Sequence, residues 1–238
     1  MLFLHAQINK MKQIILLDHC GVLLYCKATI MNIIYKNPGG VAMQTLVSGF
    51  LAGICVSIGG CIYLNIQNNI VAAIFFSIAL LMVCYLQLHL YTGKIGFTIN
   101  NHNKKDLADL GLMLMGNIIG TVCMGLTPLN IDSAKIETII NNKMALNIPL
   151  IFINAFMCGV LMYIAVYIYK HRNSIVGILF CIPTFILCGF EHVIAYCYYF
   201  VASRTINLDS IIFLCITLLG NTVGSIAFAL LLSFSKKK

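Results

Sequence analysis

Six apolar stretches, each long enough to cross a lipid bilayer, constrain this chain more than any other feature of its sequence. A membrane-spanning helix needs about 20 mostly apolar residues. The stretches that meet this requirement are residues 45–64, 70–91, 107–126, 148–169, 175–201 and 208–232. The connections between them are short and polar. The sequence therefore predicts an all-α membrane protein, with one six-span transmembrane domain over residues 43–234 and a basic cytoplasmic tail at 235–238.

The composition excludes the main classes of soluble protein. Hydrophobic residues make up 61% of the chain and charged residues only 9%, whereas soluble domains carry about 25% charged residues. The 11 cysteines include no CxxC pair, and most stand singly inside apolar runs. We therefore predict no metal, no cofactor and no nucleic-acid partner. Only two histidines, His89 and His192, lie within the predicted spans, which argues against a haem or redox enzyme.

The positions of the basic residues predict the orientation. If the N-terminus is cytoplasmic, 11 of the 15 Lys and Arg residues lie on the inner side and three in the outer loops. This distribution follows the positive-inside rule and places both termini in the cytoplasm. The multi-pass chain is then expected in a plasma membrane of bacterial type. We interpret residues 1–42 as a cytoplasmic or interfacial segment with an amphipathic helix; a seventh span is the alternative.

Two parts of the chain resemble each other. The run LMGNIIG at residues 114–120 matches LLGNTVG at 218–224 with an offset of 104 residues. The run FLAGI at 50–54 matches FMCGV at 156–160 with an offset of 106. Because each half holds three spans, the halves would insert in opposite orientations, as in many transporters. We therefore expect an inverted 3+3 repeat; chance similarity among glycine-bearing helices is the alternative.

The middle span of each half contains a helix-breaking sequence. Gly93 lies in a segment with two glycines and a lysine, and Gly189 lies in mid-run. Non-helical backbone at membrane depth persists only where it is buried in protein or lines a cavity. Paired breaks in corresponding spans therefore indicate the permeation site. The predicted architecture is aquaporin-like, with helices two and five broken.

Ionisable residues beside these breaks are the candidates for function, because charge within a bilayer is costly. We interpret His192 as a proton donor or polar contact for a permeating species; a histidine that only packs helices is the alternative. Thr92 offers a hydroxyl or simply caps a helix. We expect Glu191 to be structural and to satisfy amide groups freed by the break.

Two lysines have alternative interpretations. Lys143 precedes the fourth span on the outer side, where it either draws anions toward an entrance or is a solvated loop residue. Lys94 lies at the edge of a span. It either snorkels to the membrane surface, which we favour, or supplies a cation to an inner vestibule.

At the breaks the sequence resembles the formate/nitrite transporter family. The run GFEHVIA at residues 189–195 is similar to the GFEHxxAN signature of that family, and LYTG at 90–93 to its LFTGN segment. The Gly-Asn pairs ending at Asn117 and Asn221 are compatible with it. The resemblance implies broken helices two and five, a homopentamer with one pore per subunit, and transport of small monovalent weak-acid anions.

The resemblance also assigns roles to individual residues. It implies that His192 is the central histidine and Thr92 the pore threonine. The implied apolar constrictions are Phe76, Leu80, Leu90, Tyr91 and Phe185. The residues expected to be structural at the breaks are Gly93, Gly189, Glu191, Asn117 and Asn221. The chain departs from the family pattern at His89, Lys94, Asn147, Tyr163 and Tyr196.

The functional hypothesis is a proton-linked channel or transporter rather than an enzyme. An isolated anion in a low-dielectric interior faces a large solvation penalty, so passage of the neutral acid is favoured. The expected partners are a proton, the lipid bilayer and a small anion such as formate, nitrite, hydrosulfide or a short carboxylate. The alternatives are a neutral-solute channel of aquaglyceroporin type, although no Asn-Pro-Ala motif occurs, and a non-transporting membrane scaffold.

Overall fold

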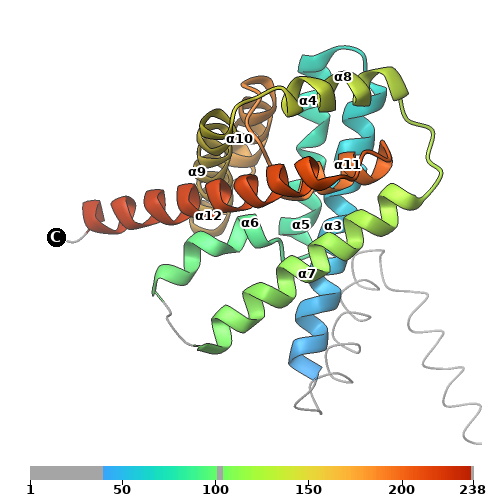
Figure 1. Cartoon of the computed structure of the whole chain (residues 1–238). Coiled ribbons are helices and arrows are strands. Elements are labelled where there is room, and N and C mark those ends of the chain that lie inside the picture. The colour runs from blue at the N-terminus through green and yellow to red at the C-terminus, as the bar shows by residue number, and fades with distance from the viewer. Residues whose placement is uncertain (1–39, 101–103, 237–238) are drawn as a thin grey trace, which may run out of the picture. The chain divides into compact units, whose positions relative to one another are not determined.

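The computed structural model describes residues 40–100 and 104–236, and these residues form helices without strands (Figure 1). The chain divides between Gln44 and Thr45 into two units, and all contacts described here lie within the second. The helices are α3 (Gly40–Asn65), α4 (Asn69–Phe76), α5 (Ile78–Tyr85), α6 (Tyr91–Lys94), the 3₁₀ helix η1 (Ile95–Asn100), α7 (Lys104–Leu126), α8 (Ser133–Met144), α9 (Ile148–Arg172), α10 (Val176–Leu187), α11 (Val193–Ala202) and α12 (Leu208–Lys236).

Four of the helices in the described part are long and apolar enough to cross a membrane. They are Gly40–Asn65, Leu107–Leu126, Ile148–Arg172 and Leu208–Lys236. Over the described residues, the prediction of an all-helical chain with several apolar helices of membrane-spanning length is therefore confirmed. The N-terminal segment predicted at residues 1–42 lies almost entirely outside the described residues. The predicted tail at 235–238 is described only through Lys236, which ends α12.

The long helices pack in pairs with their backbones in close contact. Gly53 on α3 faces the backbone carbonyl of Asn117 on α7, and Gly159 on α9 faces that of Asn221 on α12. A Cβ atom at either glycine would collide with the facing carbonyl oxygen. Small residues at membrane helix contacts allow such close approach. The approach brings the side chains of both asparagines within reach of the neighbouring breaks.

The second and fifth predicted spans are not continuous helices. The chain leaves helical geometry between Tyr85 and Tyr91, and again between Leu187 and Val193. The first interruption lies upstream of Gly93, which is part of α6. Gln87 and Gly189 occupy equivalent points of the two interruptions, with φ of 54° and 70°. Left-handed backbone is costly for residues with a Cβ. Of these two residues, Gly189 is therefore the one suited to this conformation.

The connection over residues 130–147, predicted as a polar segment on the outer side, contains helix α8. Asp132 caps its N-terminus and accepts a hydrogen bond from the backbone N–H of Lys135 at 3.0 Å. Ile136 and Ile140 are buried one helical turn apart. The capping residue and this spacing are a local signal for a short amphipathic helix, which a search for long apolar runs misses.

Helix α8 is tied to the end of α3 and the start of α4. The ammonium of Lys135 donates to the carbonyl oxygens of Tyr63 at 2.8 Å and Ile66 at 2.6 Å. The amide of Gln67 donates to Asp132 at 2.8 Å. The backbone N–H of Lys135, followed by this amide, lowers the pKa of the Asp132 carboxyl. These contacts fix the helix that carries Lys143.

Candidate functional site

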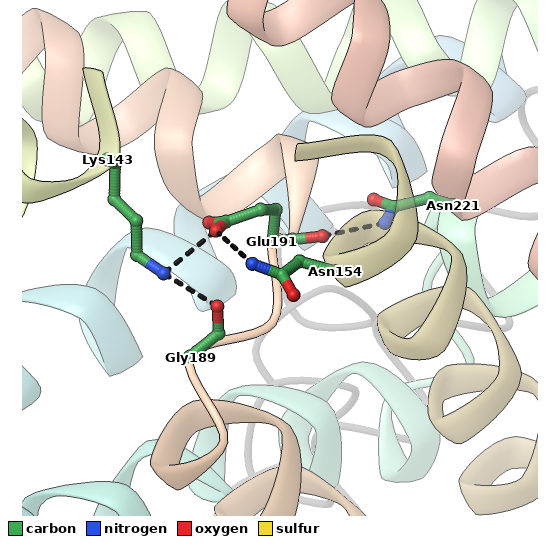
Figure 2. Close-up of polar contacts among 5 residues, drawn as sticks. All are labelled: Lys143, Asn154, Gly189, Glu191 and Asn221. Carbon is green, nitrogen blue, oxygen red and sulfur yellow. Dashed lines mark hydrogen bonds and ion pairs between the residues drawn. The ribbon is translucent and has the colours of Figure 1, made fainter. Parts of the chain in front are cut away.

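A buried asparagine of α12 holds the second break. The side-chain oxygen of Asn221 accepts the backbone N–H of Val193 at 3.0 Å. Its amide nitrogen donates to the carbonyl oxygens of Ala155 at 2.8 Å and Glu191 at 2.7 Å; Figure 2 shows the bond to Glu191. Asn221 is fully buried. The Asn221 side chain thus satisfies the backbone N–H of Val193 and the carbonyl of Glu191, both freed by the break. It also bonds the carbonyl of Ala155 on the adjacent helix α9.

Asn117 does the same at the first break. Its side-chain oxygen accepts the backbone N–H of Tyr91 at 2.9 Å. Its amide nitrogen donates to the carbonyl oxygens of Gly49 at 2.8 Å and His89 at 2.9 Å. The corresponding residues of the two sets of contacts lie 102, 104 or 106 positions apart, so the sequence repeat is accompanied by two matching sets of contacts. The asparagines, rather than Glu191, satisfy the amide groups of the breaks.

The two breaks meet at a hydrogen bond between Thr92 and His192. The Thr92 hydroxyl oxygen lies 2.8 Å from Nε2 of His192. Both side chains are buried, with 1% and 3% of their surface exposed. Thr92 comes from α6 and His192 caps α11. The sequence predicts Thr92 and His192 separately as candidate site residues. The fold brings them into contact although they lie 100 positions apart.

The contacts of His192 determine which of its nitrogens carries a proton. The backbone N–H of Ala195 points at Nδ1 at 3.3 Å. Because a backbone N–H can only donate, Nδ1 accepts, and the neutral ring carries its proton on Nε2. Nε2–H therefore donates to Thr92, and the Thr92 hydroxyl keeps its own hydrogen for another acceptor. A second proton on Nδ1 would break the bond that caps α11.

Apolar side chains flank this pair. The rings of Phe76 and Phe185 are 6.2 Å apart and nearly perpendicular, and the Phe185 ring lies 5.9 Å from the His192 ring. Leu80 and Leu90 are buried. The Tyr91 hydroxyl instead lies 3.0 Å from that of Thr222 on α12.

Two cavities approach the site from different ends of the α4–α5 segment. The first, which we name the Lys143 cavity, has a volume of about 180 Å³ and contains Phe76, Phe185 and His192 in its wall. The second, the Lys94 cavity, has a volume of about 300 Å³ and contains Leu80 and Leu90. Tyr91 lines neither. In Figure 1, α8 lies near α4 at the top of the view, and α6 lies at the level of α5.

Lys143 is paired within the protein. Its ammonium lies 2.8 Å from a carboxylate oxygen of Glu191 and donates to the carbonyl of Gly189 at 2.6 Å. Asn154 donates to the same carboxylate oxygen at 3.4 Å. Figure 2 shows these side chains converging on the second break. Lys143 is therefore neither a loop residue nor freely solvated, and Glu191 is the counter-charge for it.

Replacing Lys143 with methionine is expected to lower the free energy of unfolding by about 3–5 kcal/mol, the usual effect of leaving a buried charge unpaired. Glu191 has no exposed surface, whereas 17% of the Lys143 side chain is exposed. The Glu191→Gln change should therefore cost less. The measurement is thermal unfolding of the detergent-solubilised protein.

The same assay provides the control for this ion pair. Arg172→Gln removes a positive charge from an exposed position and should leave unfolding unchanged. The double variant Lys143→Met/Glu191→Gln should recover stability relative to Lys143→Met. Simple addition of the two single effects would contradict a coupled pair.

Two departures from the family pattern have structural roles. The Asn147 side chain caps α9 by accepting the backbone N–H of Leu150 at 3.0 Å. Tyr163 packs against Phe97, with ring centroids 4.9 Å apart. Neither residue lines the Lys143 or the Lys94 cavity.

Three other departures lie at the site. Tyr196 lines the Lys143 cavity beside His192. His89 supplies a carbonyl to Asn117. Lys94 lines the Lys94 cavity.

Comparison with known proteins identifies the family. A model described as "Formate/nitrite transporter" matches residues 29–235. A solved structure described as an FNT family ion channel is 20% identical, has a TM-score of 0.71, and aligns over 92% of this chain and 100% of its own. A second, described as a pentameric formate channel with formate bound, is 16% identical with a TM-score of 0.70, over 84% of this chain and 98% of its own. No curated protein matches. The chain is therefore an integral membrane protein of the formate/nitrite transporter family.

Proposed function

We propose that the chain is a channel for small monovalent weak-acid anions, which cross together with a proton as the neutral acid. The observation that carries this proposal is the buried hydrogen bond between Thr92 and His192, flanked by apolar side chains and approached by two cavities. Candidate substrates are formate, nitrite, hydrosulfide and short carboxylates. Formate is the molecule bound in one of the two similar solved structures.

The architecture we propose has six membrane crossings in an inverted 3+3 repeat, with the second and fifth helices broken. The matching contacts of Asn117 and Asn221 support it. We further propose a homopentamer, because one structural neighbour is described as pentameric. Both termini lie on the cytoplasmic side in this proposal, so that Lys94 faces the cytoplasm and Lys143 the outside.

The proposed mechanism follows from the cost of moving charge. An anion between the rings of Phe76 and Phe185 would lose its hydration without gaining a counter-charge. The neutral acid avoids this penalty and can accept a hydrogen bond from the Thr92 hydroxyl. The Nε2–H of His192 orients that hydroxyl by donating to its oxygen. Water in the cavities supplies and removes the proton, while the imidazole stays neutral.

Flux through reconstituted vesicles tests the proposal. Formate, nitrite or hydrosulfide added outside should acidify the vesicle interior faster than in protein-free vesicles, because each anion enters with a proton. Glycerol should cause no added swelling. The measurement is an internal pH dye with light scattering in parallel. Glycerol swelling without acidification would favour a neutral-solute channel, and the absence of both would favour a non-transporting scaffold.

A further inference from the structure

The two cavities differ in the charge that they can offer to an anion. The ammonium of Lys143 is already paired with Glu191 and bonded to Gly189. The walls of the Lys94 cavity contain two lysines, Lys94 and Lys170, and no acidic residue. Among the described side chains, which leave out those of residues 1–39, 100–106 and 237–238, neither lysine has a carboxylate within ion-pair distance. Of the two cavities, the Lys94 cavity is thus the one whose described lining carries positive charge without a paired carboxylate.

The two lysines come from different elements. Lys94 ends α6, two positions after Thr92, and Lys170 lies in the last turn of α9. The Lys170 ammonium lies 3.9 Å from the centre of the Phe97 ring, and the face of an aromatic ring attracts a cation. Among the described residues, Asp109 is an acidic group that acts on Lys94, from beyond ion-pair distance. The described part of the fold therefore holds two like charges at one cavity without a carboxylate paired to either.

Such an arrangement has a physical use. Two neighbouring ammonium groups repel each other, and an anion placed between them offsets that repulsion. A cavity with one sign of charge and apolar walls also focuses its field and concentrates counter-ions. Here Leu80, Leu90 and Val166 form the apolar wall. An anion held by the lysines would lie next to the apolar passage toward Thr92.

We propose that the Lys94 cavity is an anion-binding site for a small carboxylate or other monovalent oxyanion, and that it makes the channel kinetically asymmetric. The inference rests on the proposed function, because the bound anion is the species that is then protonated and passed on. Lys143, already neutralised by Glu191, attracts anions less strongly. The channel therefore saturates at lower anion concentration from the Lys94 side than from the Lys143 side.

Side-resolved flux tests the asymmetry. In right-side-out and inverted membrane vesicles, the KM for formate should be lower when formate is supplied on the Lys94 side. Lys94→Asn and Lys170→Gln should each raise that KM about threefold to tenfold, the loss of one unit charge at close range in a partly aqueous site. Lys94→Arg should retain the low KM. The difference should shrink at high salt, which screens charge.

The matched control is Arg172→Gln, which removes the same charge from the same end of α9. Arg172 is exposed and lies outside the cavity lining, so it should leave KM unchanged. Equal KM values from the two sides would overturn the proposal. So would equal effects of Lys94→Asn and Arg172→Gln, which would indicate only a general surface charge.

A second measurement does not depend on transport. Cys84 lines the same cavity, so bound anion should slow its alkylation by N-ethylmaleimide, followed by mass spectrometry. Formate should protect Cys84 in the parental protein and not in Lys94→Asn/Lys170→Gln. Protection without any flux would support the anion site and contradict the proposed function. Flux without protection would contradict the anion site alone.

Discussion

Replacing His192 with phenylalanine is expected to reduce formate flux by about 100-fold. An aromatic ring would remain at this position, but the Thr92 hydroxyl and the Ala195 N–H would both lose their partner. Each buried polar group left without a partner costs about 1–3 kcal/mol. The Thr92 hydroxyl would also lose the contact that aims its hydrogen at the substrate. The measurement is acidification of reconstituted vesicles by external formate.

Two variants sharpen this test. His192→Gln keeps a side-chain N–H donor and should retain part of the flux. His171→Phe makes the same exchange at an exposed histidine that stacks on Tyr167, and it should have no effect. Full flux in a correctly folded His192→Phe variant would remove the histidine from the mechanism.

The pH dependence tells apart two roles of the imidazole. Flux through the parental protein should rise as the pH falls, because more of the substrate is then the neutral acid. His192→Gln should show the same slope, since the proton comes from water in the cavities. Loss of the pH dependence of flux in the His192→Gln variant would mean that the imidazole ring itself supplies the proton.

Replacing Asn221 with leucine is expected to prevent accumulation of the folded protein. The change leaves the N–H of Val193 and the carbonyl of Glu191 without their partner, and it removes the additional bond to the Ala155 carbonyl inside α9. At about 1–3 kcal/mol for each group, the sum is comparable with the whole stability of a typical domain, about 5–15 kcal/mol. The measurement is the yield of monodisperse protein on size exclusion, followed by thermal unfolding.

Comparison variants isolate the role of the amide. Asn221→Asp can still accept from Val193 but cannot donate to either carbonyl, so it should be almost as harmful. Asn117→Leu should have a similar effect through the first break. Asn141→Leu, at an exposed position of α8, should be tolerated. Normal yield of Asn221→Leu would show that the break does not depend on these bonds.

Long apolar runs made much of the fold predictable. The predicted spans at 45–64, 107–126, 148–169 and 208–232 fall within α3, α7, α9 and α12, and the family expected from the GFEHVIA run is confirmed. Both observations rest on local sequence. A membrane span can be recognised from the length and composition of one segment, and the family can be recognised from one short sequence motif.

Contacts between distant residues could not be predicted in this way. The Gly-Asn pairs are visible in the sequence, but the bond from Asn117 to Gly49 joins positions 68 apart, and that from Asn221 to Ala155 joins positions 66 apart. The pairing of Lys143 with Glu191 needs helix α8, whose apolar face is short. No local sequence pattern indicates which part of the protein a short helix such as α8 packs against.

The way in which each break is held has a consequence for biosynthesis. Every bond of Asn117 reaches back to a residue made earlier, from Gly49 to Tyr91. A ribosome that has delivered residues up to 126 has therefore supplied all the partners for the first break. The bond from Thr92 to His192 needs residues synthesised much later. Translation thus supplies every residue that holds the first break before the residue that completes the central contact.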